Sequence, residues 1–260
     1  MSKRFGTIGY VLAFLAVCGF LLGWKFYIAA ERPGDIADYQ KRLSITAENI
    51  SAPAATDNPD DALRVYAVNI VEARPFKDPS ITYGVYLGQG LVLTAAHLTG
   101  RFPFAARPHV LIAGQDLPAV LIKVNASEQI DLALLSVDQE RLPVALRLRR
   151  NPLCIGNFQI GASVTVAYLE RTVRSQIISP LLIAPQRRTK FATLINDAQG
   201  AGAGIFNPDK KCLLGLVSLS MTKFAYRKES WRMTTRADGY ASYFVPAALI
   251  ANFVRPELGF

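Results

Sequence analysis

Residues 88–100 read GQGLVLTAAHLTG. The stretch opens on a glycine-flanked turn, continues as a short run of branched apolar residues, and ends in small residues just before His97. Branched apolar residues bounded by turn residues are typical of a β-strand. The stretch therefore predicts a buried strand that carries at its end a histidine, the side chain most often used as a general base.

Comparable apolar runs follow one another along most of the chain, each bounded by Gly, Pro, Asn or Asp. Only PAALIANFV, which begins at Pro246, predicts a helix, because proline is favoured in the first helical turn. Many short strands with one terminal helix favour a β-barrel or a sandwich. The predicted strands are residues 63–71, 82–88, 90–96, 109–114, 119–125, 131–137, 162–169, 175–184, 203–207 and 212–220.

Two further stretches contain residues of chemical interest. EQIDLALLSVD, residues 128–138, places Asp131 at the start of a buried strand. LINDAQGAGAGIFN, residues 194–207, is a glycine-rich turn followed by a strand. Glycine-rich turns often hold a reactive group, yet between Asn196 and Asn207 there is no serine, threonine, cysteine, histidine or lysine.

The order histidine, aspartate, glycine-rich turn resembles the trypsin-like serine protease superfamily, in particular its HtrA-like branch. The resemblance runs roughly from Leu63 to Val254, and its most specific part is the TAAH sequence that ends at His97. TVRSQIIS (172–179) and YFVPAALIANF (243–253) resemble a strand of the second barrel and the closing helix. The resemblance implies an all-β fold, a chymotrypsin-like double six-stranded β-barrel with a C-terminal helix.

In that superfamily a serine hydroxyl attacks the amide carbonyl, a histidine takes its proton, and an aspartate orients the imidazole. The resemblance assigns the last two roles to His97 and Asp131. Ser218, in GLVS, stands where the family has a serine that supports the aspartate. We interpret the three residues as a remnant whose plain role is a satisfied polar cluster between the barrels.

The nucleophile is missing from the turn. The best register places Gln199, Gly200, Ala201, Gly202 and Ala203 on the five family positions, so that Ala201 occupies the place of the serine. The neighbouring register puts Gly202 there, and neither has a hydroxyl. Departures at three successive positions favour natural degeneration over one introduced Ser→Ala change. Gln199 also replaces a glycine that normally lets an N–H group turn inward.

Several functions stay open at this stage. The first is a pseudo-protease that binds a partner, or serves as a scaffold or accessory subunit of a membrane complex, without hydrolysis. The second is an active endopeptidase with a displaced nucleophile, for which Ser220 and Ser242 are the candidates. The segment after Ser218 is long, aromatic and basic, and the alternative to partner binding is a loop that covers a sheet edge. The candidate partner surface comprises Gln199, Gly200 and Gly202 of the turn and Leu219, Tyr226, Arg227 and Trp231 of this segment.

The N-terminus is predicted to lie in a membrane. Residues 5–24 carry no charge and are long enough to cross a bilayer as a helix, and aromatic residues follow them. These features favour a retained anchor (1–30) over a cleavable signal peptide ending near YIAAE. Residues 31–61 predict a linker, with a short helix near 35–50, and 62–260 the barrels. The resemblance implies a bacterial inner membrane, with the barrels on the periplasmic side.

Positive charge is concentrated in residues 141–236, which hold 16 basic and four acidic side chains, a net of +12 in a chain of +9. Such a surface suits anionic lipid or an acidic protein partner. No nucleic-acid recognition motif accompanies it. Cys154 and Cys212 form either one disulfide or two buried thiols, and with two histidines a metal site is not expected. No cofactor is predicted, because the glycine-rich turn leads into a strand and not a helix.

Overall fold

The computed structural model describes residues 59–74, 77–99, 108–127, 129–196, 198, 200–229 and 232–258. The anchor predicted at 1–30 and most of the linker predicted at 31–61 lie outside these residues. Within them, no helix has the length and apolar character needed to cross a bilayer.

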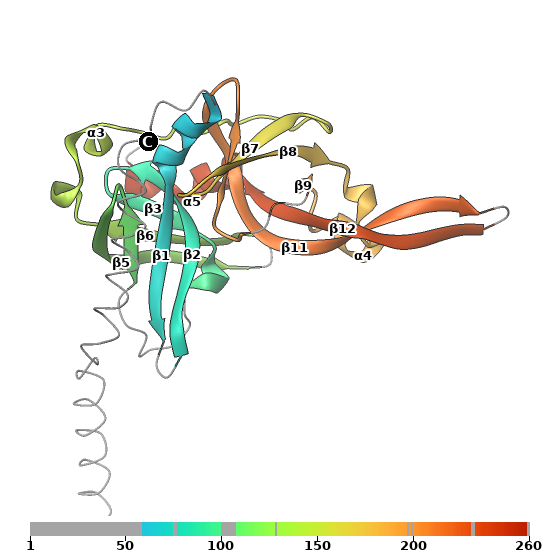
Figure 1. Ribbon diagram of the computed structural model, residues 1–260, viewed down its shortest axis with the longest axis horizontal. Helices are drawn as coiled ribbons and strands as arrows, with labels where there is room; N and C mark the ends of the chain where they lie inside the picture. The colour runs from blue at the N-terminus through green and yellow to red at the C-terminus, as the bar shows by residue number, and fades with distance from the viewer. Residues whose placement is uncertain are drawn as a thin grey trace, which may run out of the picture. The chain divides into compact units, whose positions relative to one another are not determined.

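Twelve antiparallel strands form two closed barrels of six strands each (Figure 1), which confirms the predicted double barrel. The first barrel has the order β1-β2-β3-β6-β5-β4 and the second β10-β11-β12-β9-β8-β7. The first contains β1 (Ala67–Arg74), β2 (Lys77–Gly88), β3 (Leu91–Thr94), β4 (His109–Ile112), β5 (Gln115–Ala126) and β6 (Asp131–Val137). The second contains β7 (Ser163–Ala167), β8 (Thr172–Ile178), β9 (Leu194–Asn196), β10 (Gly204–Asn207), β11 (Cys212–Glu229) and β12 (Arg232–Pro246).

Short helical segments connect the strands, and one longer helix closes the chain as predicted. The 3-10 segments are η1 (Pro59–Tyr66), η2 (Ala96–Leu98), η3 (Gln139–Arg141) and η4 (Pro180–Leu182). The α-helices are α3 (Val144–Arg147), α4 (Pro185–Arg188) and α5 (Ala247–Leu258).

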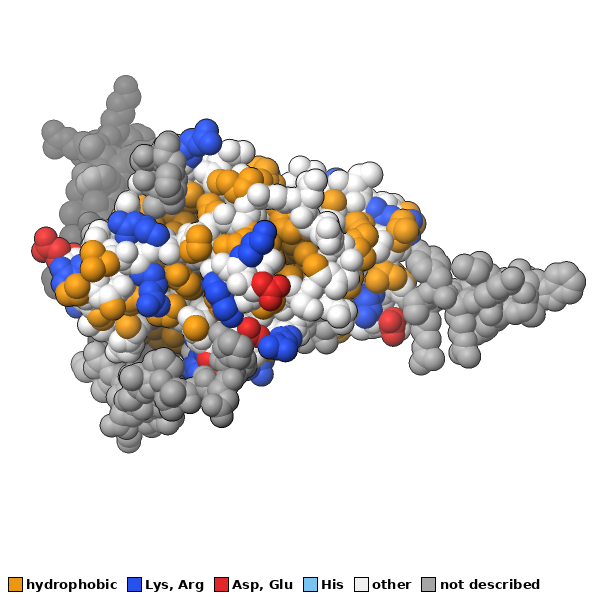
Figure 2. Space-filling model, turned by 90° about the horizontal axis from the view of Figure 1, so that it is seen from above, with side chains coloured by type: hydrophobic (Ala, Val, Ile, Leu, Met, Phe, Trp, Pro, Cys, Tyr) orange, Lys and Arg blue, Asp and Glu red, His pale blue; other side chains and the backbone are white. Residues whose placement is uncertain are grey.

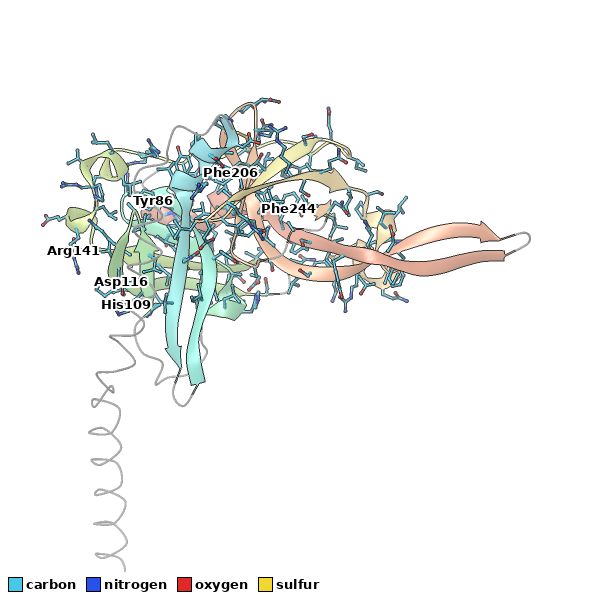
Figure 3. The ribbon with its side chains drawn as sticks, viewed as in Figure 1. Tyr86, His109, Asp116, Arg141, Phe206 and Phe244 are labelled. Atoms are coloured by element: carbon cyan, nitrogen blue, oxygen red, sulfur yellow. A yellow bond between two sulfur atoms is a disulfide. The ribbon has the colours of Figure 1, made fainter. Side chains whose placement is uncertain are left out.

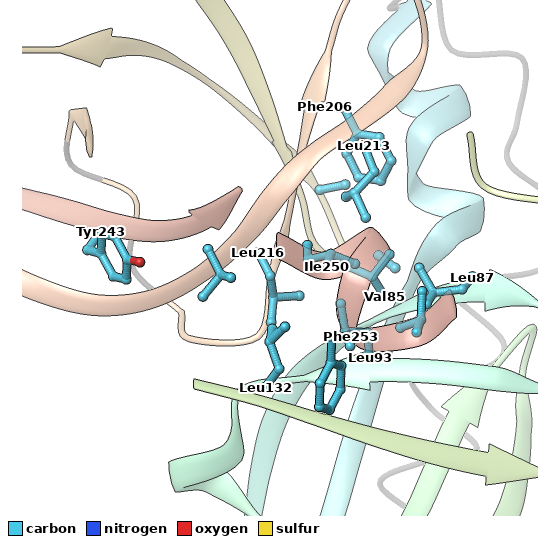
Figure 4. Close-up of a cluster of buried hydrophobic side chains, with 14 of the residues drawn as sticks. Val85, Leu87, Leu93, Leu132, Phe206, Leu213, Leu216, Tyr243, Ile250 and Phe253 are labelled. Atoms are coloured by element: carbon cyan, nitrogen blue, oxygen red, sulfur yellow. The ribbon is translucent and has the colours of Figure 1, made fainter. Parts of the chain in front are cut away.

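Three apolar clusters explain why the central strands are uniformly apolar. One cluster fills each barrel, and the third lies between the barrels and receives α5 (Figure 4). β6 shows the reason: Leu135 packs inside the first barrel, whereas Leu132 and Leu134 belong to the cluster between the barrels. A strand buried on both faces has no polar face to alternate with.

Several elements differ from the sequence prediction. Residues 63–66, predicted as part of a strand, belong to η1, where Arg64 donates two hydrogen bonds to the carbonyl of Leu169. The strand predicted at 175–184 stops at Ile178, because Ser179 caps η4 and Pro180 begins it. Five elements have no counterpart in the sequence prediction, because they are short, polar or contain glycine: β9, β12, η3, α3 and α4.

Beyond the second barrel, β11 and β12 continue as a two-stranded arm, which we define as residues 222–239 (Figure 1). Cross-strand pairing runs out to Glu229 and Arg232, with a register shift between Thr222 and Phe224. The arm is therefore an extended hairpin and does not fold back as a loop over the barrel edge.

Candidate functional site

β3 delivers His97 to the junction of the barrels. Its last residue, Thr94, is fully buried, and its hydroxyl donates to the carbonyl of Tyr83 at 2.7 Å. Ala95 and Ala96 are also buried, so only small side chains fit this tight turn. The hydroxyl of Thr99 donates to the carbonyl of Ala96 and closes η2 around His97.

The structure brings His97, Asp131 and Ser218 together in one hydrogen-bonded cluster. The Nδ1 atom of His97 lies 2.6 Å from Oδ2 of Asp131, and the backbone N–H of His97 donates to Oδ1 at 2.8 Å. The hydroxyl of Ser218 donates to Oδ2 at 2.7 Å. These hydrogen bonds compensate the carboxylate for its loss of water, because Asp131 is buried.

The cluster is open on the histidine side only. The side chain of His97 is 40% exposed, whereas that of Asp131 is 8% exposed. With Nδ1 engaged by the carboxylate, Nε2 is the ring nitrogen left to face a ligand. Among the residues that the structure describes, His97 has no hydrogen-bond partner other than Asp131. A group that approaches this imidazole would meet an oriented base.

Tyr243 lies near enough to Asp131 to feel its charge, and it was not found from the sequence. Its hydroxyl donates to the carbonyl of Gln129, two residues before Asp131. Burial, and to a lesser degree the charge of Asp131, raises the pKa of Tyr243 to about 12. The phenol therefore stays neutral and acts as a fixed hydrogen-bond donor. A tyrosine in an apolar strand carries no sequence signal for this role.

The glycine-rich turn is shaped by close packing against the first barrel. Gly200 and Gly202 have φ values of +113° and +90°, which glycine adopts far more readily than other residues. A Cβ atom on Gly200 would lie 2.7 Å from the ring of Tyr83. A Cβ atom on Gly202 would lie 1.9 Å from the carbonyl oxygen of Tyr83 and 2.8 Å from Oγ1 of Thr94. These glycines are needed for contact between the barrels.

Backbone hydrogen bonds fix the turn beside Ser218. The N–H of Gly202 donates to the carbonyl of Val217 at 2.7 Å, and the N–H of Val217 donates to the carbonyl of Ala203 at 2.9 Å. Ala201, next to Gly202, is partly exposed and ends in a methyl group. A methyl group can neither attack a carbonyl nor accept a proton. The turn therefore has an ordered backbone and no nucleophile at Ala201.

The remaining predicted binding residues are distributed over β11 or lie outside the description. Leu219 is partly buried against the cluster between the barrels. Tyr226 and Arg227 lie on the arm, where only the backbone is described. Gln199 and Trp231 lie outside the described residues.

Of the two serines considered as displaced nucleophiles, Ser242 is buried and its hydroxyl donates to the carbonyl of Ala198. Ser220 is exposed on β11, opposite Ser242 in the register. Ser242 is thus occupied, whereas Ser220 is accessible.

The second histidine lies elsewhere, on β4. Nδ1 of His109 is 2.8 Å from Oδ1 of Asp116 on β5 (Figure 3). In the described part of the chain, no group of three or more His, Cys, Asp or Glu side chains could hold a metal ion. Cys154 and Cys212 form a disulfide with a Cα–Cα distance of 5.4 Å.

The described structure has two closed six-stranded antiparallel barrels with a His–Asp–Ser cluster where they meet. These features identify its fold. The fold is the chymotrypsin fold of the trypsin-like serine proteases.

Solved structures with this fold include the active form of the Rv3671c protease from M. tuberculosis, with 17% identity and a TM-score of 0.52 over 78% of this chain and 85% of that chain. HL collagenase is 14% identical, with a TM-score of 0.55 over 75% of this chain and 94% of its own. Kallikrein-related peptidase 10 is 18% identical, with a TM-score of 0.51 over 75% and 95%. No family model and no curated protein matches the sequence.

Proposed function

We propose that this chain is a membrane-anchored trypsin-like pseudo-protease, which acts as a binding or scaffold protein, or as an accessory subunit of a membrane protein complex, without hydrolysing peptides. The barrels would present a surface to a protein partner while the N-terminal segment holds them at the membrane.

One observation carries the proposal. The cluster of His97, Asp131 and Ser218 is formed with short hydrogen bonds, yet Ala201, at the position predicted for the nucleophile, ends in a methyl group. Loss of the nucleophile from such a cluster leaves a residual rate orders of magnitude below that of a working enzyme. A base without a nucleophile to activate still has structural value, because its ring nitrogen hydrogen-bonds the buried carboxylate of Asp131.

The arm is the surface proposed for partner contact. It extends beyond the barrel as a two-stranded ribbon, and a two-stranded ribbon alone is marginally stable in water. Its sequence, KFAYRKESWRMTTRAD, contains tyrosine, tryptophan and arginine, which dominate binding hot spots. Docking of the arm would give the scaffold its specificity.

The proposed location is the periplasmic side of a bacterial inner membrane. The charge-free residues 5–24 support the anchor. The disulfide between Cys154 and Cys212 supports an oxidising compartment, because disulfides rarely persist in a reducing cytoplasm. The net charge of residues 141–236 supports an acidic partner or anionic lipid as the opposing surface.

An active hydrolase with a displaced nucleophile is the second candidate function, and the exposed position of Ser220 is the observation in its favour. Against it, Ser220 lies two residues beyond Ser218 on β11, and no described hydrogen bond joins it to His97. A proteolytic serine needs the imidazole within hydrogen-bond reach.

A fluorophosphonate probe, which reacts with activated serines, separates the two functions. We expect no labelling of the full chain in mild detergent. The matched control is Ala201→Ser, which adds only the missing hydroxyl to the same turn. Labelling of the unaltered chain that disappears in His97→Ala would overturn the proposal, and loss in Ser220→Ala would then identify the nucleophile.

A further inference from the structure

The corner of the first barrel around α3, residues 141–150, presents an unusual surface. Val144 and Leu148 are 60% and 78% exposed, and Ala145 between them is exposed too. Positions i and i+4 of a helical turn, here Val144 and Leu148, lie on one face. The outward face of this corner is therefore apolar. Single exposed apolar side chains are ordinary, but a rigid apolar face is a sign of an interaction site.

The opposite face of the same segment is fixed by core packing and hydrogen bonds. Leu142 and Leu146 are buried in the cluster inside the first barrel. The hydroxyl of Tyr86 donates to the carbonyl of Leu146 at 3.1 Å, and the N–H of Asn151 donates to the carbonyl of Leu87. The outward apolar residues are thus not the result of loose packing, because their neighbours in the sequence are fixed in the core.

Four arginines lie in the same segment; the guanidinium of Arg150 donates to the carbonyls of Arg147 and Arg149, and that of Arg149 lies over the ring of Tyr66. Arg141 and Arg150 are exposed, and Arg147 and Arg149 are partly exposed. None of the four forms an ion pair with another described residue. Figure 2 shows basic and apolar side chains side by side at the end of the domain where α3 lies, and Figure 3 labels Arg141 there. The acidic residues nearest in sequence, Asp138 and Glu140, precede the corner and leave residues 138–150 with a net charge of +2.

We infer that the α3 corner docks onto an anionic lipid bilayer, with Val144 and Leu148 entering the headgroup boundary and the arginines contacting lipid phosphates. Apolar side chains flanked by cations are the composition of surfaces that lie in a membrane interface. Each juxtamembrane arginine strengthens attraction to an anionic leaflet. An acidic protein partner would also bury an apolar centre inside a polar rim. A membrane is favoured as the occupant because the predicted anchor holds the barrels beside one.

The length of the chain before the barrels favours a membrane as the occupant. The inference uses the anchor of the proposed function but not the missing nucleophile. A chain of the length of residues 25–58 has a root-mean-square reach of about 30 Å. Tethering at that distance gives the corner a high effective concentration at the bilayer, so that a weak surface is enough for docking.

Hydrogen exchange of the full chain tests the inference. The amides of Val144 and Ala145 lie in the first turn of α3, where N–H groups have no intrahelical acceptor, so their exchange reports the access of water directly. Exchange is measured with excess vesicles of phosphatidylcholine, alone or with about a quarter phosphatidylglycerol, a composition that supplies the negative surface potential. We expect exchange at residues 144–149 to slow about fivefold or more with the anionic vesicles, and this slowing to vanish at high salt.

Two variants and a matched control complete the test. Arg141→Gln combined with Arg150→Gln should weaken binding to the anionic vesicles about 25-fold, at about fivefold per arginine, and so abolish the protection. Leu148→Ser should reduce it without a change in charge. Ile160→Ser combined with Lys210→Gln alters an exposed apolar and an exposed basic residue elsewhere and should have no effect.

Equal exchange rates with neutral and anionic vesicles would overturn membrane docking. The α3 corner would then be a binding site for an acidic protein. Loss of protection in the control pair also overturns membrane docking, because binding would then depend on overall charge. The two proposals can fail separately. If the unaltered chain reacts with the fluorophosphonate probe while anionic vesicles still slow exchange at residues 144–149, the proposed function is wrong and the membrane-docking inference holds.

Discussion

Replacing Gly202 by alanine should destabilise the protein far more than the same replacement at Gly161 or Gly156. A Cβ atom there would lie 1.9 Å from the carbonyl oxygen of Tyr83, and a carbonyl cannot move aside as a flexible side chain can. The same carbonyl accepts the hydroxyl of Thr94, on the strand that delivers His97. The substitution therefore disrupts the packing of the glycine-rich turn against the first barrel.

The expected magnitude is a sum of three parts. A left-handed φ costs an alanine about 1–2 kcal/mol. Displacing packed backbone costs about 1–3 kcal/mol, and loss of the hydrogen bond between Thr94 and Tyr83 costs about 1 kcal/mol. The total, about 3–6 kcal/mol, is a large share of a typical folding free energy of about 5–15 kcal/mol.

Urea unfolding followed by circular dichroism measures the change, with two matched controls. Gly161→Ala has φ of +88° but nothing within 4 Å of the added atom, so it isolates the cost of the backbone conformation. Gly156→Ala also has open space, and its φ is not left-handed, so it should be close to neutral. A value for Gly202→Ala within about 1 kcal/mol of Gly161→Ala would refute the reasoning, because the clash would then cost nothing.

Three more outcomes follow from the structure. Burial alone would raise the pKa of Asp60, but Arg174 and Lys211 more than offset it and lower that pKa below 3.8. Asp60→Asn should therefore cost about 1–3 kcal/mol near neutral pH. In a pH titration of stability, the difference from wild type should begin to shrink near pH 3.8 and vanish only below the lowered pKa. Reduction of the Cys154–Cys212 disulfide, which closes a separation of 58 residues, should cost about 2–4 kcal/mol, whereas an unchanged melting temperature would contradict its contribution. Tyr243→Phe should remove from the ultraviolet titration a phenol that ionises at about pH 12, and a titration identical to wild type would count against the buried position of this hydroxyl.

The central strands could be predicted because their apolar patterns are local. β3, β6 and β10 read as short branched runs between turn residues, and their burial on two faces is the physical cause of that pattern. The terminal helix α5 was equally clear from its proline and its apolar residues. By contrast, β12 contains Arg236, Asp238 and Gly239, since much of it extends beyond the barrel and needs no apolar alternation.

The residues of the candidate site also divide into those that the sequence could predict and those that it could not. His97, Asp131 and Ser218 could be proposed from their family-like surroundings, although nothing in their spacing alone gives a distance between side chains. Tyr243 could not be found, because its role depends on the carbonyl of Gln129, which lies 114 positions away. The hydrogen bonds of Arg64 could not be predicted either, because residues 63–66 of η1 alternate apolar and polar side chains as a strand does and fall in the strand predicted at 63–71.

By itself the sequence determined which residue types were available to this protein: short apolar strands, a turn rich in glycine, and no hydroxyl between Asn196 and Asn207. Only the tertiary structure decided which of those residues meet. Packing of the two barrels against each other brings Asp131 and Ser218, 87 positions apart, to a 2.7 Å hydrogen bond, and the fold leaves Val144 and Leu148 exposed. The physical reason is that strand patterns record which face is buried, whereas the identity of the neighbour on that face depends on how distant strands pair.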